Sequence, residues 1–154
     1  MNLLISLATL IVIVTVIARI LRPGRPASFR GKAWVIDGDT LAFDTRRVRL
    51  YGIDAPEMGQ SQGPDAKRFL ISLVKGQTLT IRPIETDKYG RLVARVFRED
   101  GTDVAEMMVG RGFALASSRY TRDYDAAQKI AEANFTGFWR HGGVQNGAAF
   151  RAAQ

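Results

Sequence analysis

The chain has no cysteine and a single histidine, His141, among its 154 residues. Without cysteine the protein cannot form a disulfide, a thiolate metal site or a cysteine nucleophile. One histidine cannot supply the several imidazole ligands of a zinc or iron site, and beside Gly142 and Gly143 it is typical of an exposed residue. The metal ligands that remain are oxygen atoms, which favour calcium, magnesium or manganese. We therefore expect any bound metal to be a hard cation held by carboxylates and carbonyls.

Positive charge exceeds negative charge, with a net charge of +7 and an isoelectric point near 10.2. The excess is unevenly distributed, because Gly31 to Gly143 holds 17 Lys and Arg against all 15 Asp and Glu, a net charge of +2. The other arginines lie at the ends of the chain, most of them close to a hydrophobic segment. Membranes also attract positive charge at such places, so the overall basicity is weak support for a nucleic-acid partner.

The N-terminal hydrophobic segment predicts a transmembrane or signal-anchor helix over residues 1–21. Leu3 to Ala18 contains no charged residue, and the apolar run continues past Arg19 to Leu21, about the length that crosses a hydrocarbon core. A cleaved signal peptide is the alternative, but the segment lacks a basic start and a convincing small-x-small cleavage site. The membrane is therefore an expected partner.

The rest of the chain divides into three parts. Residues 22–30 hold two prolines and a glycine between arginines, which predicts a basic linker. Residues 31–141 predict one folded domain, which is long enough to bury a hydrophobic core without covalent cross-links. Residues 142–154 are rich in Gly and Ala, which predicts a flexible tail.

Within the folded domain, short strands alternate with helices. Periodicity and turn residues predict strands at Ala33–Ile36, Leu41–Phe43, Arg47–Ile53, Thr78–Ile84 and Arg91–Phe97. Helices are predicted from Pro64 to Gly76, from Asp103 to Gly110 and from about Arg122 to Asn134. If the third strand is regular, Arg49, Tyr51 and Ile53 share one face. This order predicts an α+β domain built on a compact barrel.

Three polar clusters stand at turns and strand ends: Asp37–Thr40, Arg49–Glu57 and Asp87–Arg91. The first and third, taken alone, are also typical of ordinary turns. Hydrolysis of a phosphodiester without cysteine or histidine needs neutralised phosphate, an activated water and charge placed around the transition state. A carboxylate-bound metal, a carboxylate base and arginine forks supply these functions, and the three clusters contain all of these residue types.

Taken together, the clusters closely resemble those of the staphylococcal nuclease, or thermonuclease, family. The motifs are D-G-D-T, R-L-Y-G-I-D-A-P-E and T-D-K-Y-G-R, followed by E-M-M-V-G-R-G-F-A and a late tryptophan. The resemblance covers about Gly31 to Trp139. It implies the fold of that family, a five-stranded OB-type β-barrel with three helices.

The resemblance also implies a calcium site and a catalytic set. Asp39 and Asp54 match the calcium carboxylates, and Ala55 matches the residue that offers its backbone carbonyl. Glu57 matches the glutamate usually described as the general base, a role that is debated for the family. Arg49 and Arg91 match the two arginines that bind the phosphate and stabilise the transition state.

The same resemblance implies substrate contacts outside the catalytic set. Lys88 and Tyr89 fall where the family contacts the terminal phosphate. Tyr120 matches one of two tyrosines that bind the nucleotide, while Ser118 takes the place of the other. Because a base stacked on an aromatic ring gains about 1–3 kcal/mol, base preference is expected to differ from the family prototype.

We therefore expect a calcium-dependent, sugar-nonspecific nuclease that cleaves DNA and RNA, leaves 3′-phosphate ends and acts as a monomer. Two alternatives remain open: a non-catalytic OB module that only binds nucleic acid, and a membrane-tethered adaptor. The basic residues after residue 18 favour a cytoplasmic domain. Weak calcium binding and the hazard of a nonspecific nuclease to its own cell favour the outer face of the cell envelope, which is our expectation.

Overall fold

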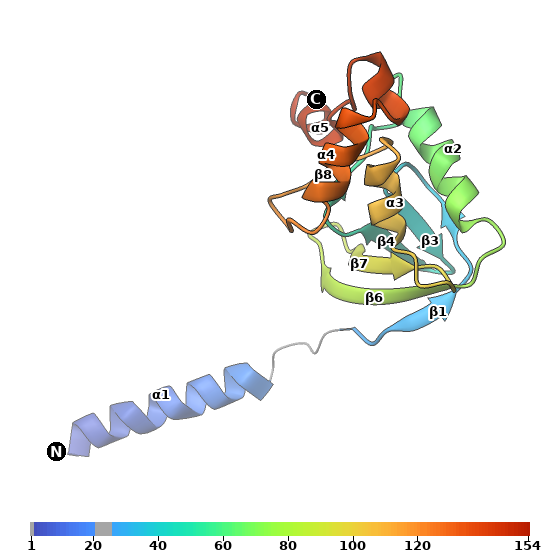
Figure 1. Cartoon of the computed structure of the whole chain (residues 1–154). Coiled ribbons are helices and arrows are strands. Elements are labelled where there is room, and N and C mark those ends of the chain that lie inside the picture. The colour runs from blue at the N-terminus through green and yellow to red at the C-terminus, as the bar shows by residue number, and fades with distance from the viewer. Residues whose placement is uncertain (1, 21–25) are drawn as a thin grey trace.

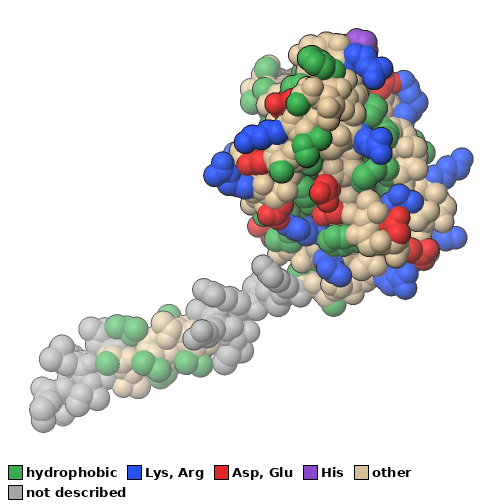
Figure 2. All heavy atoms as spheres, viewed as in Figure 1, with side chains coloured by type: hydrophobic (Ala, Val, Ile, Leu, Met, Phe, Trp, Pro, Cys, Tyr) green, Lys and Arg blue, Asp and Glu red, His purple; other side chains and the backbone are tan. Residues whose placement is uncertain are grey.

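The computed structural model describes residues 2–20 and 26–154, and within the first helix it describes side chains only for residues 8–17. This helix, α1, spans Asn2–Ile20, and its described side chains are exposed, the hydrophobic ones green in Figure 2. No helix in the described part of the chain is both long and apolar enough to cross a membrane, so the predicted transmembrane anchor over 1–21 is not supported. The predicted linker lies outside the described residues from 22 to 25.

The domain contains one large, curled sheet and one small one, as Figure 1 shows. The large sheet has the strand order β1-β6-β7-β4-β3-β2, with β4 and β7 parallel and the other neighbours antiparallel. The small sheet pairs β5 with β8. The strands are β1 (Phe29–Gly31), β2 (Trp34–Val35), β3 (Thr40–Phe43), β4 (Arg46–Leu50), β5 (Ile53–Asp54), β6 (Leu79–Thr86), β7 (Leu92–Phe97) and β8 (Leu115–Ala116).

Helices cover the concave side of the large sheet and close the core. They are α2 (Gly63–Val74), α3 (Val104–Gly110), α4 (Asp125–Ala133), the 3₁₀ helix η1 (Gly137–His141) and α5 (Gly147–Ala152). Helix α3 contacts α2, α4 and β7, so it lies at the centre of the domain (Figure 1). Asp103 caps its N-terminus, and the side chain of this residue accepts the N–H groups of Ala105 and Glu106. The core between sheet and helices includes Leu41, Val48, Leu70, Ile81 and Met108, all of them fully buried.

The predicted α+β class and the helices α2, α3 and α4 are confirmed, but the strand count is different. The large sheet has six strands where five were predicted, because Phe29 and Arg30, assigned to the linker, pair with β6 as part of β1. The strand predicted from Arg47 to Ile53 is broken by a turn at Tyr51 and Gly52, which separates β4 from β5. The face predicted to carry Arg49, Tyr51 and Ile53 is therefore not continuous.

The C-terminal region also differs from the sequence prediction. Residues 142–154 were expected to form a flexible tail, yet they contain α5, which Asn146 caps by accepting the N–H of Ala149 at 2.8 Å. Helix α5 lies against the domain near α4 (Figure 1), and the N–H of its Ala148 donates to Asp54 at the end of β5. This position brings the end of the chain next to the carboxylates that the sequence singled out.

Candidate active site

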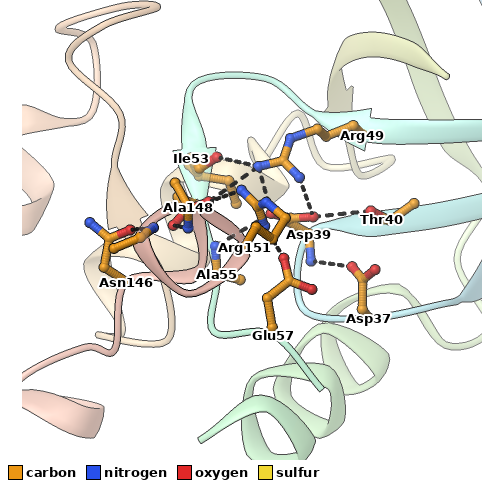
Figure 3. Close-up of polar contacts among 12 residues, drawn as sticks. Asp37, Asp39, Thr40, Arg49, Ile53, Ala55, Glu57, Asn146, Ala148 and Arg151 are labelled. Carbon is orange, nitrogen blue, oxygen red and sulfur yellow. Dashed lines mark hydrogen bonds and ion pairs between the residues drawn. The ribbon is translucent and has the colours of Figure 1, made fainter. Parts of the chain in front are cut away.

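Two buried carboxylates meet around one arginine. Asp39 precedes β3 and is 4% exposed, and Asp54 ends β5 and is 6% exposed. Arg49, from β4, lies between them: its two terminal nitrogens are each 3.0 Å from one oxygen of Asp39, and Nη2 is 3.4 Å from Oδ1 of Asp54. Figure 3 shows the guanidinium directed into this cluster. Arg49 is therefore the shared counter-ion of both carboxylates.

The turn that carries Asp39 is pressed against the segment that follows Asp54. A Cβ atom on Gly38 would lie 2.7 Å from that of Ala55, closer than such atoms approach, so only glycine fits there. The N–H of Asp39 donates to Oδ1 of Asp37 at 3.0 Å, which shapes the turn, and the N–H of Ala55 points at Oδ2 of Asp39 at 3.4 Å. The turn thus fixes the distance between the two carboxylates.

Burial raises the pKa of Asp39 to about 6, against the attraction of Arg49, which lowers it. The neighbouring charge of Asp37 raises this pKa further, while hydrogen bonds from Thr40 and Ala55 lower it. A further cation nearby would stabilise the ionised form of Asp39, because loss of hydration is the main effect that disfavours this form. The cluster is therefore suited to holding positive charge.

A second arginine reaches the same cluster from the C-terminal helix. Arg151 of α5 places Nη2 2.8 Å from Oδ1 of Asp54, and it also forms an ion pair with Glu57 (Figure 3). The N–H of Ala148 donates to the other oxygen of Asp54 at 2.9 Å. Two acidic side chains that are close in sequence are thus joined by a residue from the far end of the chain.

A pocket of about 430 Å³ opens beside the cluster. Arg49, Asp54 and Arg151 line one part of it, and the turn after β6 contributes Asp87, Lys88, Tyr89 and Arg91. The remaining lining residues of note are Ser117, Arg119 and Tyr120. Cationic side chains therefore outnumber acidic ones in the pocket lining, which favours an anionic ligand.

Arg91 is held in place by the turn in which it lies. Its Nε is 2.8 Å from Oδ2 of Asp87, and its backbone N–H donates to Oδ1 of the same residue at 3.0 Å. Partial burial works to raise the pKa of Asp87, but the hydrogen bonds from Arg91 and Tyr89 outweigh it and leave this pKa below its ordinary value. Asp87 therefore stays ionised and orients the guanidinium of Arg91.

Two tyrosines flank the pocket with exposed rings. Tyr89 is 72% exposed, and the guanidinium of Arg91 lies 5.5 Å from the centre of its ring. Tyr120 is 53% exposed and packs edge-on against Tyr51, whose hydroxyl donates to the backbone carbonyl of Tyr120 at 2.6 Å. Ser118 is exposed in the same loop. Two exposed aromatic rings in the pocket lining are thus available to a flat ligand.

Comparison with known proteins assigns this arrangement to a family. The model of a family described as staphylococcal nuclease homologues matches residues 47–141. The chain belongs to the staphylococcal nuclease family. A protein of Escherichia coli named as an uncharacterized endonuclease is 37% identical over 111 residues, which cover 68% of this chain and 72% of the relative. A micrococcal nuclease of Shigella flexneri is 33% identical over 144 residues, with 82% and 83% covered.

The structure brings together most of the residues that the likeness to staphylococcal nucleases selected. Asp39, Asp54 and Arg49 are in direct contact, and Ala55 adjoins them. Glu57 joins the group through Arg151 rather than through Arg49. The other predicted residues, Arg91, Lys88, Tyr89 and Tyr120, line the pocket away from the carboxylates. The structure places these side chains, and their roles remain predictions.

The donors of the cluster fit a hard cation. Asp39, Asp54 and the carbonyl of Ala55 offer only oxygen, the donor type that calcium prefers. The described residues contain no group of three or more His, Cys, Asp or Glu side chains that could hold a metal. A cation at this place would therefore complete its coordination with water or with oxygens of the ligand.

Sequence reasoning missed Arg151 and the segment that carries it. The local signal was present, because Asn146 is a favoured N-cap and is followed by a run rich in alanine. The contact itself had no signal, since Arg151 is separated by 97 residues from Asp54. The family likeness also ended near Trp139, before this segment begins.

Proposed function

We propose that this protein is a calcium-dependent nuclease that hydrolyses phosphodiester bonds in DNA and RNA. The observation that carries the proposal is the buried pair Asp39 and Asp54, joined by Arg49 at the edge of a basic pocket. Membership of the staphylococcal nuclease family and the names of the relatives support a nuclease. Calcium dependence and the choice of nucleic acid rest on the site itself.

Asp39, Asp54 and the Ala55 carbonyl are the proposed calcium ligands. Bound there, calcium would supply positive charge to the phosphate and to the developing oxyanion. The two carboxylates are held apart from bulk water, and Arg49 and the turn at Gly38 fix their positions before a ligand arrives. Such preorganisation is the property that makes electrostatic stabilisation effective.

Arg49 and Arg91 are the proposed phosphate-binding residues. Both line the pocket, and each is oriented by a carboxylate: Arg49 by Asp39 and Arg91 by Asp87. A guanidinium presents paired N–H donors to two phosphate oxygens, a geometry that lysine lacks. Lys88, in the same turn as Arg91, would add charge at the terminal phosphate.

Glu57 is the proposed general base toward the attacking water. Its side chain is about a quarter exposed, so water reaches it, and its backbone N–H donates to the side chain of Gln60 at 2.7 Å, which fixes the loop. In the structure Glu57 pairs with Arg151, so it can accept a proton only when that pairing is loosened.

Tyr89 and Tyr120 are the proposed contacts for the nucleotide. Their rings are exposed and both line the pocket, and stacking on them tolerates any base. Stacking on an aromatic ring requires no sugar hydroxyl, which supports action on both DNA and RNA. We expect 3′-phosphate products and a monomeric enzyme.

The proposed function also bears on where the protein works. A site with two carboxylates and one carbonyl is expected to bind calcium weakly, so it fills where calcium is abundant. We therefore place the domain outside the cytoplasm, where it also spares the nucleic acid of the cell. Protease added to intact spheroplasts should then digest the domain, while digestion only after lysis would reverse this placement.

Cleavage and end-group analysis test the function. The full chain is incubated in calcium with single- and double-stranded DNA and RNA, and the product ends are identified. We expect cleavage of all of them with 3′-phosphate ends, and loss of cleavage in Asp39→Ala with the fold retained by circular dichroism. Binding of the same nucleic acids without cleavage would instead identify a non-catalytic OB module.

A further inference from the structure

The C-terminal segment, residues 143–151, is tied to the loop before α2 by a reciprocal pair of side chains. Oε1 of Gln62 accepts the N–H of Gln145 at 2.7 Å, and Oε1 of Gln145 accepts the N–H of Gln62 at 3.1 Å. The amide of Gln62 also donates to the carbonyl of Gly143 at 2.8 Å. These bonds fix the direction in which the segment leaves η1 and lead it over the carboxylate cluster.

The segment engages both oxygens of Asp54. Oδ1 accepts from Arg151 at 2.8 Å and Oδ2 accepts the N–H of Ala148 at 2.9 Å, while Arg151 also pairs with Glu57. Figure 3 shows the guanidinium of Arg151 between the cluster around Asp39 and the carboxylate of Glu57. One side chain thus occupies the proposed metal carboxylate and the proposed base at the same time.

The backbone of the same segment covers the third proposed ligand. Gly147 is buried, and a Cβ atom added to it would lie 2.2 Å from the carbonyl oxygen of Ala55 and 3.3 Å from Oδ2 of Asp54. Only glycine permits this approach. Residues 147–151 therefore cover Asp54 and Ala55, and Arg151 pairs with Glu57.

A calcium ion bound to Asp54 would compete with Arg151 for Oδ1, which the guanidinium contacts at 2.8 Å, and the two cations would repel each other at so short a distance. We propose that residues 143–151 form an autoinhibitory strap, with Arg151 as a built-in cation that calcium displaces from Asp54 and Glu57. The inference rests on the proposed function in one respect, the identity of the calcium ligands. It adds a regulatory step, in which metal binding and release of the strap are coupled.

The attachments of the strap suit reversible release. Helix α5 has only six residues, and Gly147 is the buried one among them. The side chain of Arg151 is 41% exposed, so its ion pairs are partly screened by water. Segments with few buried apolar contacts open at a free-energy cost below that of global unfolding. Bound calcium can therefore shift the strap without unfolding the domain.

Calcium affinity of the full chain tests the proposal without relying on nuclease activity. Titration calorimetry compares the wild type with Arg151→Gln, which keeps most of the side-chain volume and removes the charge. Arg140→Gln is the matched control, because Arg140 is also exposed and belongs to η1, outside the strap. We expect Arg151→Gln to bind calcium about fivefold or more tightly than the wild type, within the usual range of coupling between sites. Arg140→Gln should match the wild type.

Hydrogen exchange supplies the reciprocal measurement. Because coupling acts equally in both directions, calcium should speed exchange of the amides at 148–151 in the wild type. Equal or weaker calcium binding by Arg151→Gln, or unchanged exchange at 148–151 with calcium bound, would overturn the strap and leave the proposed function standing. Failure of every variant to bind calcium would overturn the proposed function together with the strap.

Discussion

Replacing Arg49 tests whether one guanidinium balances both buried carboxylates. Arg49→Met keeps the length of the apolar stem and removes the charge that contacts Asp39 through two 3.0 Å bonds and Asp54 at 3.4 Å. Asp39 would keep only the hydroxyl of Thr40 and the N–H of Ala55 as partners, so a nearly buried charge would lose its counter-ion.

The expected loss of stability follows from the burial of each group. Removing one partner of a fully buried ion pair costs about 3–5 kcal/mol. Two features of the site place the loss below that range: Asp54 retains Arg151, and the raised pKa of Asp39 lets this carboxyl take up a proton at modest cost. We therefore expect Arg49→Met to lower the free energy of unfolding by about 2–3 kcal/mol at pH 7.

Urea unfolding in the presence of a chelator measures this loss. For a urea dependence of roughly 2 kcal/mol per molar, the midpoint should fall by about 1 M or more. Arg47→Met is the control, because Arg47 is exposed on the same strand and its replacement should leave the midpoint nearly unchanged. The double variant Asp39→Asn with Arg49→Met should regain at least half of the unfolding free energy that Arg49→Met loses. An unchanged midpoint in Arg49→Met, or no recovery in the double variant, would refute the counter-ion role.

Other predictions concern the pocket and the buried hydrogen bond between Tyr124 and Asp103. Arg91→Lys and Glu57→Gln should each lower kcat on an oligonucleotide by about a hundredfold or more, and near-normal turnover would show that bulk charge or water alone suffices. Tyr120→Ala should raise KM for single-stranded DNA about tenfold by removing a stacking surface, whereas an unchanged KM would place the base elsewhere. The buried hydroxyl of Tyr124 donates to Asp103 at 2.9 Å, and burial raises its pKa so that it stays protonated. Tyr124→Phe should therefore lower the unfolding free energy by about 1 kcal/mol, and an unchanged Tm would contradict this.

Local signals predicted much of the fold. The turn at Asp37–Asp39 and helix α3, with its cap at Asp103, follow from residues that are neighbours in sequence, and the structure contains both. The break at Gly52 was missed because one glycine within an alternating pattern leaves the strand period intact. Strand β1 was missed because Phe29 adjoins a segment of proline and arginine, and its pairing with Ile81 is a distant contact.

The residues of the candidate site were likewise predicted in part and missed in part. The resemblance of the motifs to the family predicted Asp39, Arg49 and Asp54 as site residues. The structure places these three in contact across strand ends and turns. Arg151 lay beyond the reach of such reasoning, because an isolated arginine in a Gly- and Ala-rich segment carries no sign of its partner. Its position follows from the burial of Gly147 and from the reciprocal hydrogen bonds that guide the segment, which are properties of the folded chain.

The most direct test of the central claim is a calcium titration of nucleic-acid cleavage by the full chain. A quenched fluorescent oligonucleotide reports cleavage as calcium is added to protein previously treated with a chelator. We expect no cleavage in the chelator, full recovery with calcium, and no cleavage by Asp54→Ala at calcium levels that saturate the wild type. Full activity of the wild type in excess chelator, or normal cleavage by Asp54→Ala, would contradict this claim.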